Sequence, residues 1–177
     1  MFNAKVKTFL SARHGVAALE FALVAPLYFA LIMSGIELGW IMTKSTMLDY
    51  AVINASKFVY TGAAQQNSLS NTDIEDFICS RALILTNCNQ NITVELTPIT
   101  AITSPPTTDI QCRDAADTSI NPVVTYDPGA GSTIVFMRVC VSTEIFTPFL
   151  GVGLALPKND QGRYEMITST AFVNEPF

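Results

Sequence analysis

The hydrophobic pattern changes its character once along the first sixty residues. From Val16 to Ile36 nearly every position is apolar, and as a helix this run would be about 31 Å long, enough to cross a hydrocarbon core of roughly 30 Å. Beyond it no strong helix breaker follows. The apolar positions then fall on one stripe: Ile41, Leu48, Ala51, Val52, Ala55, Phe58 and Val59. The pattern predicts one helix from about Arg13 to Thr61, stopped by Gly62, with its first half in lipid and its second half carrying a domain.

The remaining pattern predicts a second helix and three strands. Thr72-x-x-Glu75 has the spacing of a capping box, and one face of the helix after it is apolar: Ile74, Phe77, Ile78, Ala82 and Leu85. Residues 87–91 are typical of a turn, whereas 92–97, 134–143 and 164–173 are expected strands. Residues 98–132 have no period and are expected to form a surface loop. We therefore predict an α+β fold, in which a long N-terminal helix packs on a small antiparallel β-sheet.

The charges divide the chain into two parts of opposite sign. The 177 residues carry a net charge of -5, yet the first fifteen contain Lys5, Lys7 and Arg13 and no acid. Basic residues before an apolar span place the N-terminus inside under the positive-inside rule. The acidic remainder has no basic stripe and argues against nucleic acid as a partner. The expected organisation is a basic leader at 1–15, a membrane-spanning then amphipathic helix at 16–62, and an extracytoplasmic domain at 63–177.

Four cysteines lie beyond the apolar run, at positions 79, 88, 112 and 140. An even number on the exported side suggests disulfides formed in an oxidising compartment. Three pairings are possible. We favour Cys79–Cys88 with Cys112–Cys140, because the first pair closes a short local loop after a helix. Buried free thiols remain the alternative.

Glu20 is the only charged residue within the apolar run, and it comes five positions after Gly15. A charged group in a membrane segment costs about 2.5–3.5 kcal/mol on insertion scales, so Glu20 is a candidate functional residue. Glu37 follows the run and either marks the outer membrane boundary or has a packing or partner role. Gly35 and Gly39 have the spacing that allows close helix–helix packing.

Catalytic motifs are absent from the sequence. The only histidine, His14, lies in the leader, and neither a nucleophile elbow nor a phosphate loop or dinucleotide-binding fingerprint occurs. Four aspartates of the long loop lack the spacing of an EF-hand and are better explained as a solvated acidic surface than as a calcium site: Asp109, Asp114, Asp117 and Asp127. We predict no enzymatic activity, no cofactor and no metal.

The segment Gly15-Val-Ala-Ala-Leu-Glu20-Phe21-Ala-Leu-Val-Ala-Pro26 resembles the N-terminus of TadE-like pseudopilins, which belong to tight-adherence (Tad, or Flp) pilus systems and are related to type IV pilins. The resemblance extends through Gly35-x-Glu37 and 51–62. It implies that a membrane prepilin peptidase cuts after Gly15 and leaves Val16 as the new N-terminus. It also implies a role for Glu20 and Phe21 in assembly and register.

The same resemblance implies a minor pilin-like structural subunit that acts in pilus assembly, by priming, at the tip or as an adaptor, and in adhesion. Its expected partners are other pilin and pseudopilin subunits, the prepilin peptidase, an inner-membrane assembly platform and membrane lipid. The expected location is the bacterial inner membrane, as a single-pass protein. The alternative is a signal-anchored extracytoplasmic binding or sensory domain that is not processed as a pilin.

The cut would create an unusual charge. A free α-amine on Val16 at the membrane face needs a partner, since an unpaired charge in low dielectric is costly. Glu20 lies one helical turn away, or alongside a neighbouring subunit. We therefore expect the amine–carboxylate pair to set the register between subunits.

Overall fold

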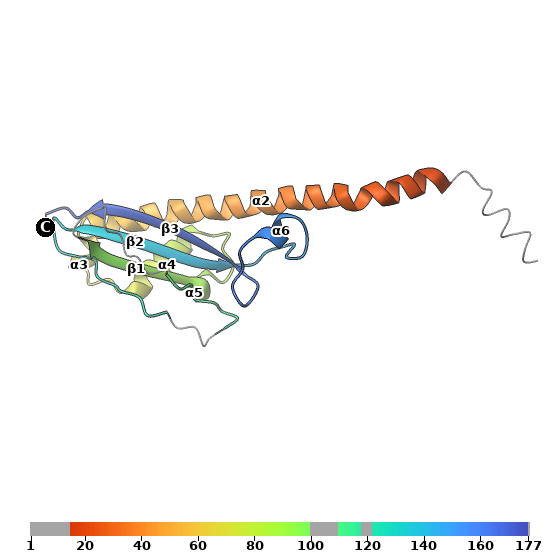
Figure 1. The fold of residues 1–177 in the computed structure, drawn as a ribbon. Helices are drawn as coiled ribbons and strands as arrows, with labels where there is room; N and C mark the ends of the chain where they lie inside the picture. The colour runs from red at the N-terminus through yellow and green to blue at the C-terminus, as the bar shows by residue number, and fades with distance from the viewer. Residues whose placement is uncertain (1–14, 100–109, 118–121, 177) are drawn as a thin grey trace, which may run out of the picture.

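A single helix of 45 residues, α2 (Val16–Tyr60), dominates the computed structural model, which describes residues 15–99, 110–117 and 122–176. At 1.5 Å per residue α2 is about 68 Å long. Its second half lies along a compact domain, while its first half projects away from that domain as an isolated rod (Figure 1). The helix continues through Pro26 in the projecting half.

The end of α2 follows from glycine chemistry. Gly62 has φ +76°, a left-handed conformation that lacks the steric penalty of a β-carbon. The N–H groups of Thr61 and Gly62 donate to the carbonyls of Lys57 and Val59, which closes the last turn. The predicted stop at Gly62 is therefore confirmed, and the chain turns there into the one-turn helix α3 (Ala63–Gln66).

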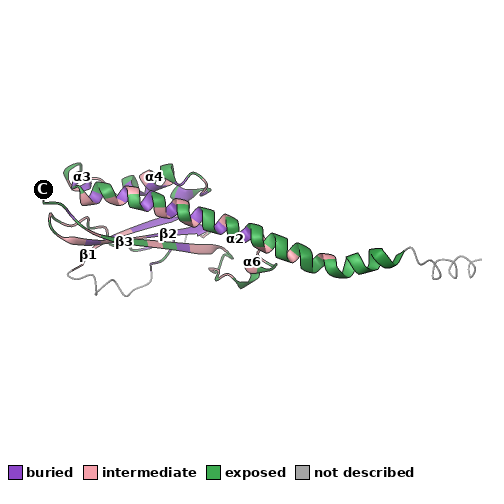
Figure 2. Cartoon of the chain, turned by 90° about the horizontal axis from the view of Figure 1, so that it is seen from above, coloured by how far each residue is buried: buried purple, intermediate pink, exposed green. Residues whose placement is uncertain are grey.

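Three antiparallel strands form one sheet in the order β1-β2-β3, and the predicted α+β fold is confirmed. The strands are β1 (Ile92–Ile99), β2 (Ile134–Thr143) and β3 (Tyr164–Val173), with Val94 opposite Val139 and Val139 opposite Thr168. Helices α2 and α4 (Asn71–Arg81) lie together on one face of the sheet, as Figure 2 shows from above.

The hydrophobic core fills the space between those two layers. Its largest fully buried apolar side chains come from α2, α4 and alternate positions of β1 and β2, as alternation predicts: Leu48, Val52, Val59, Ile74, Ile78, Ile92, Val94, Leu96, Val135, Met137 and Val139. Ala51 and Ala55 are fully buried as well, and such small side chains let α2 approach closely. Phe58 was predicted on this stripe but is 37% exposed, because its ring packs edge-on against Phe77 at the rim, with centroids 4.6 Å apart.

The start of α4 corrects one prediction. The capping box is formed by Ser70 and Asp73, not by Thr72 and Glu75. The Ser70 N–H donates to Asp73 Oδ2 at 2.8 Å, and the Asp73 N–H donates back to Ser70 Oγ at 3.3 Å. Glu75 is instead buried on the inner side of α4, where Arg113 Nη1 lies 3.2 Å from its carboxylate. Two overlapping sequences have the same spacing, and tertiary contacts decide which of them caps the helix.

Two disulfides join the pairs that the sequence favoured, Cys79–Cys88 and Cys112–Cys140. The first ties α4 to the short helix α5 (Cys88–Asn91), which replaces the expected turn. The second attaches residues 110–117 to the face of β2 that points away from the helices, where Ile110 joins the two cysteines in a small apolar cluster. The long loop is thus fastened to the sheet at this point. It is fastened again where residues 125–127 exchange backbone hydrogen bonds with Leu96.

Candidate assembly site on the long helix

The projecting half of α2 leaves its apolar side chains uncovered by the rest of the chain. Large side chains on every side of the helix are between about half and three quarters exposed, at Leu19, Phe21, Leu23, Leu27 and Phe29 among others. The helix is long and apolar enough to cross a membrane. Apolar residues all round a helix indicate burial in lipid or among other helices, since water would not favour this surface.

Gly15 and Glu20 lie at the tip of this half. Gly15 is the N-cap of α2, and a β-carbon built on it would meet nothing within 4 Å, so its backbone is open to approach. Val16 begins the helix, and Glu20 lies one turn later on the same face. Among the described residues Glu20 has no hydrogen-bond or ionic partner, and it is exposed. Its carboxylate is therefore available to a group outside the described chain.

Gly35 and Gly39 lie one turn apart on the exposed side of α2. Each is two residues from Glu37, and a separation of two residues corresponds to opposite sides of a helix. Because Glu37 faces the domain, the two glycines face away from it, and a β-carbon on either would meet nothing within 4 Å. This leaves a smooth strip that a second helix can approach closely.

Glu37 is completely enclosed, with only 1% of its surface exposed. Its carboxylate accepts hydrogen bonds from the backbone N–H of Phe146 at 3.1 Å and of Thr147 at 2.8 Å, and from Thr147 Oγ1 at 3.1 Å. Glu37 therefore does not simply mark the membrane boundary. It has the packing role that the sequence left open, and it binds the segment after β2 to the helix.

Neighbouring side chains of α2 extend this attachment in both directions along the helix. Ser34 Oγ accepts from the N–H of Val152 at 3.2 Å, where the short helix α6 (Val152–Ala155) begins. Trp40 packs on Phe146 with ring centroids 5.7 Å apart, and buried Lys44 Nζ donates to Thr143 Oγ1 at 2.6 Å. We call Ser34, Glu37, Trp40 and Lys44 the clasp. It sits where the projecting half of α2 meets the domain.

Asp114 of the 110–117 segment is buried and paired within the domain. Buried Asp114 receives Arg163 Nη1 at 3.0 Å and Asn159 Nδ2 at 2.8 Å. Burial alone would raise the pKa of Asp114, but the N–H of Ala116, the Asn159 amide and the Arg163 charge outweigh it and hold that pKa below its ordinary value. The prediction of a solvated acidic surface is wrong for Asp114, whereas Asp109 lies outside the described residues.

Glu75 shows the opposite balance on the other side of the same segment. Its burial raises the pKa above the ordinary value, and the nearby Arg113 guanidinium offsets this only in part. Arg113 is held in place because its backbone N–H donates to Thr93 Oγ1 at 2.9 Å. Sequence reasoning missed both ion pairs, because their partners are 38 and 49 residues apart in the chain.

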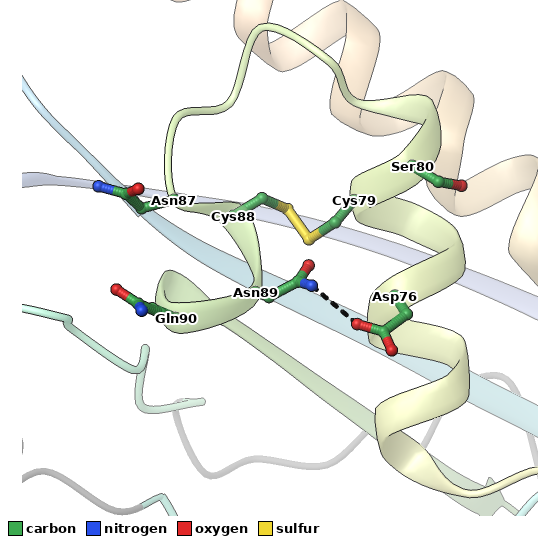
Figure 3. Close-up of a pocket in the computed structure, with 7 residues that line it drawn as sticks. All are labelled: Asp76, Cys79, Ser80, Asn87, Cys88, Asn89 and Gln90. Carbon is green, nitrogen blue, oxygen red and sulfur yellow. Dashed lines mark hydrogen bonds between the residues drawn. A yellow bond between two sulfur atoms is a disulfide. The ribbon is translucent and has the colours of Figure 1, made fainter.

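One open hollow of about 560 Å³ lies beside the first disulfide (Figure 3). It is lined by Asp76, Cys79 and Ser80 of α4 and by residues 87–90, and Asn89 Nδ2 donates to Asp76 Oδ1 across it at 2.8 Å. Both cysteines are in the disulfide, so the hollow offers no thiolate. Within the described part of the chain, no group of three or more histidine, cysteine, aspartate or glutamate side chains is placed to hold a metal.

A comparison with known protein families finds a match, which lies on α2. Residues 15–56, about a quarter of the chain, match the family model described as TadE-like protein. The matched segment begins at Gly15 and contains both Glu20 and Glu37, and it confirms the resemblance found in the sequence. No curated protein and no solved structure matches the chain.

Proposed function

We propose, from the TadE-like segment at residues 15–56, that this Tad pilus-related protein is a minor pilin-like structural subunit of a Tad-type pilus apparatus. The TadE-like family comprises structural pilus components and is not a known enzyme family. The observation that carries the proposal is that this matched segment includes the whole projecting half of α2, whose apolar side chains are exposed. A helix with such a surface is suited to lie in lipid and then beside other pilin helices.

Processing by a prepilin peptidase would prepare the helix for assembly. The peptidase would cut after Gly15, where the absence of a side chain permits close approach to the backbone. The new amine on Val16 would pair with Glu20 on its own helix or, during assembly, on a neighbouring subunit. Because separating the amine from the carboxylate in lipid would leave two uncompensated charges, the pair would favour one position of a helix along the next. Phe21 follows Glu20 directly and would pack between the helices at this level.

The location follows from charge and redox chemistry. The basic leader would keep the N-terminus in the cytoplasm, α2 would cross the bacterial inner membrane once, and the acidic domain would lie outside. Two disulfides suit that oxidising side. We expect the partners to be pilin and pseudopilin subunits and the inner-membrane assembly platform, with the smooth strip of Gly35 and Gly39 against one of their helices.

The size of the domain supports a minor role. A subunit that repeats along a filament must pack its domain against many copies of itself, whereas a priming, tip or adaptor subunit needs to fit only once. The domain of residues 63–177 is large relative to the helix and is fastened to it by the clasp. We therefore assign the chain to initiation, the tip or an adaptor position, with an effect on adhesion through pilus assembly.

N-terminal sequencing of the protein isolated from its native host tests the proposal. We expect mature chains that begin at Val16. Gly15→Lys should block the cut and leave a larger membrane-bound form, while His14→Lys adds the same charge next to the site, keeps the glycine and should still be cut. Intact chains that begin at Met1 in the wild type would contradict the proposal and favour a signal-anchored binding or sensory domain.

A further inference from the structure

The segment between β2 and β3 carries an exposed apolar surface that the proposed function does not use. Residues 145–157, which we call the apolar knob, contain no charged side chain; Glu144 and Lys158 flank them. Four of the knob's large side chains are widely exposed: Phe146 at 64%, Phe149 at 88%, Leu150 at 40% and Leu154 at 63%. So many apolar side chains on one short loop are unusual for a surface in contact with water.

The knob is held firmly in one position. The clasp binds it through Glu37 and Ser34, and Gly151 is pressed against α2 so closely that a β-carbon there would stand 1.8 Å from Ser34 Oγ. Gly151 also has φ +55°, a conformation that disfavours other residues. The exposed side chains therefore project from a fixed base.

The position of the knob along α2 indicates which environment covers its exposed apolar side chains. Gly151 lies against Ser34 and the carbonyl of Ala30, since the same β-carbon would be 3.3 Å from that oxygen. Ala30 lies about 9 Å inside the end of the apolar run at Ile36, at 1.5 Å per residue. Figure 1 shows α6 beside α2 at the end of the domain that faces the projecting half. If residues 16–36 cross the membrane, the knob reaches the outer boundary of the hydrocarbon.

The backbone of the knob is suited to that environment. A non-helical segment enters lipid only if its polar groups find partners within the protein. The N–H groups of Leu150, Leu154 and Leu156 donate to carbonyls within the knob. Those of Phe146, Thr147 and Val152 donate to the clasp, and Lys158 Nζ donates to the carbonyl of Pro148 at 2.9 Å.

We infer that the apolar knob inserts into the outer leaflet of the membrane, at the boundary between headgroups and acyl chains, as a second membrane contact beside α2. The inference goes beyond the proposed role in assembly and rests only on its claim that α2 spans the membrane. Interfacial elements bury apolar side chains about 5–10 Å deep, a depth that Phe149 and Leu154 can reach from this level. With two contacts, the domain has a fixed height and orientation on the membrane.

Tryptophan quenching in vesicles tests the inference on the full chain. Trp40 is the only tryptophan, so Trp40→Phe gives a silent background that retains a ring in the clasp. Phe149→Trp places a probe on the knob. Val123→Trp is the matched control, because Val123 is fully exposed. It lies just before residues 125–127, which pair with Leu96 in the C-terminal half of β1, at the end of the sheet far from the knob.

Each protein is reconstituted alone into phosphatidylethanolamine–phosphatidylglycerol vesicles whose acyl chains carry bromine close to the headgroups. Emission from Phe149→Trp should be quenched at least about threefold more strongly than emission from Val123→Trp, because bromine quenches only at contact depth. Equal quenching in vesicles that float with the protein would overturn the inference but leave the pilin proposal standing. Protection of Phe149→Trp only after pilus proteins are added would assign the knob to a protein partner and also overturn it. A chain that does not float with the vesicles would overturn both.

Discussion

The two halves of α2 differ both in how many apolar residues they carry and in what surrounds them. Most of residues 16–33 are exposed, whereas the inward stripe from Ile41 to Val59 is enclosed by the sheet and α4. The second half alternates small buried residues such as Ala51 and Ala55 with polar residues on its outer face, while the first half is apolar on all sides. An apolar stripe with polar residues opposite it therefore binds the domain, whereas a helix that is apolar on all sides does not need the domain to cover one face.

The carboxylates of Glu37 and Glu20 differ in the same way in their surroundings. Glu37 is satisfied by three donors from one loop of its own chain, whereas Glu20 has no partner among the described residues. A buried acid with its own donors stabilises the fold. An acid left without a partner in an apolar segment is suited to a contact that forms only with another molecule. The following tests separate these two roles.

Glu20→Ala should have the largest effect, and on assembly alone. We expect incorporation into pili or pilus complexes to fall by more than about tenfold, because a buried amine would lose its only counter-charge. Membrane insertion and the urea midpoint of the domain should not change. Co-purification with pilin subunits from the native host measures incorporation, and vesicle flotation measures membrane insertion. Wild-type incorporation of the Ala variant would remove the register role.

Glu37→Ala should act in the opposite way and destabilise the domain. Loss of the acceptor leaves the N–H groups of Phe146 and Thr147 without their partner, at a cost of about 2 kcal/mol in the free energy of unfolding. Glu37→Gln retains one oxygen and should cost about half as much. Urea unfolding in detergent measures both, with Glu20→Gln as the matched control that should leave the midpoint in place. Equal midpoints for Glu37→Ala and wild type would show that the clasp contributes no stability.

The domain should lose stability in acid through Asp114. Because its pKa is lower in the folded chain, its contribution is complete above the unfolded pKa of about 3.9 and is lost as the pH falls through the folded value. Asp114→Asn should therefore cost about 1–2 kcal/mol near pH 7 and progressively less below about pH 4. Thermal unfolding across this range measures the difference. Asp160→Asn, at an exposed site nearby, should show no such trend, and a pH-independent loss in Asp114→Asn would exclude the ionic contribution.

Gly35→Leu should have the smallest effect on the fold and a moderate one on assembly. The space around Gly35 is open within the described chain, so the free energy of unfolding should stay within about 0.5 kcal/mol of wild type. A helix packed on the strip of Gly35 and Gly39 would be forced away, and incorporation should fall by about threefold. Ile36→Leu, one position along, is the control. Unchanged incorporation of Gly35→Leu would show that this face is not packed against another helix.

Much of the fold could be predicted because its signals are local. Helix periodicity, the glycine stop at Gly62 and the alternation of β2 each depend on neighbours within a few residues, so the bounds of α2, β2 and β3 were close to those found. The choice between Ser70 and Thr72 as the cap of α4 was not local, since it depends on whether Glu75 is drawn inward to Arg113.

The sequence by itself determined a helix long and apolar enough for a membrane, with one charged residue near its start, and a small antiparallel sheet. Only the tertiary structure decided that Glu37 holds a loop about 110 residues away, that Asp114 pairs with Arg163, and that an apolar knob lies beside α2 where its projecting half begins. The reason is that a hydrogen-bond partner distant in the chain leaves no periodic trace. It becomes visible only when packing of the core has brought the two segments together.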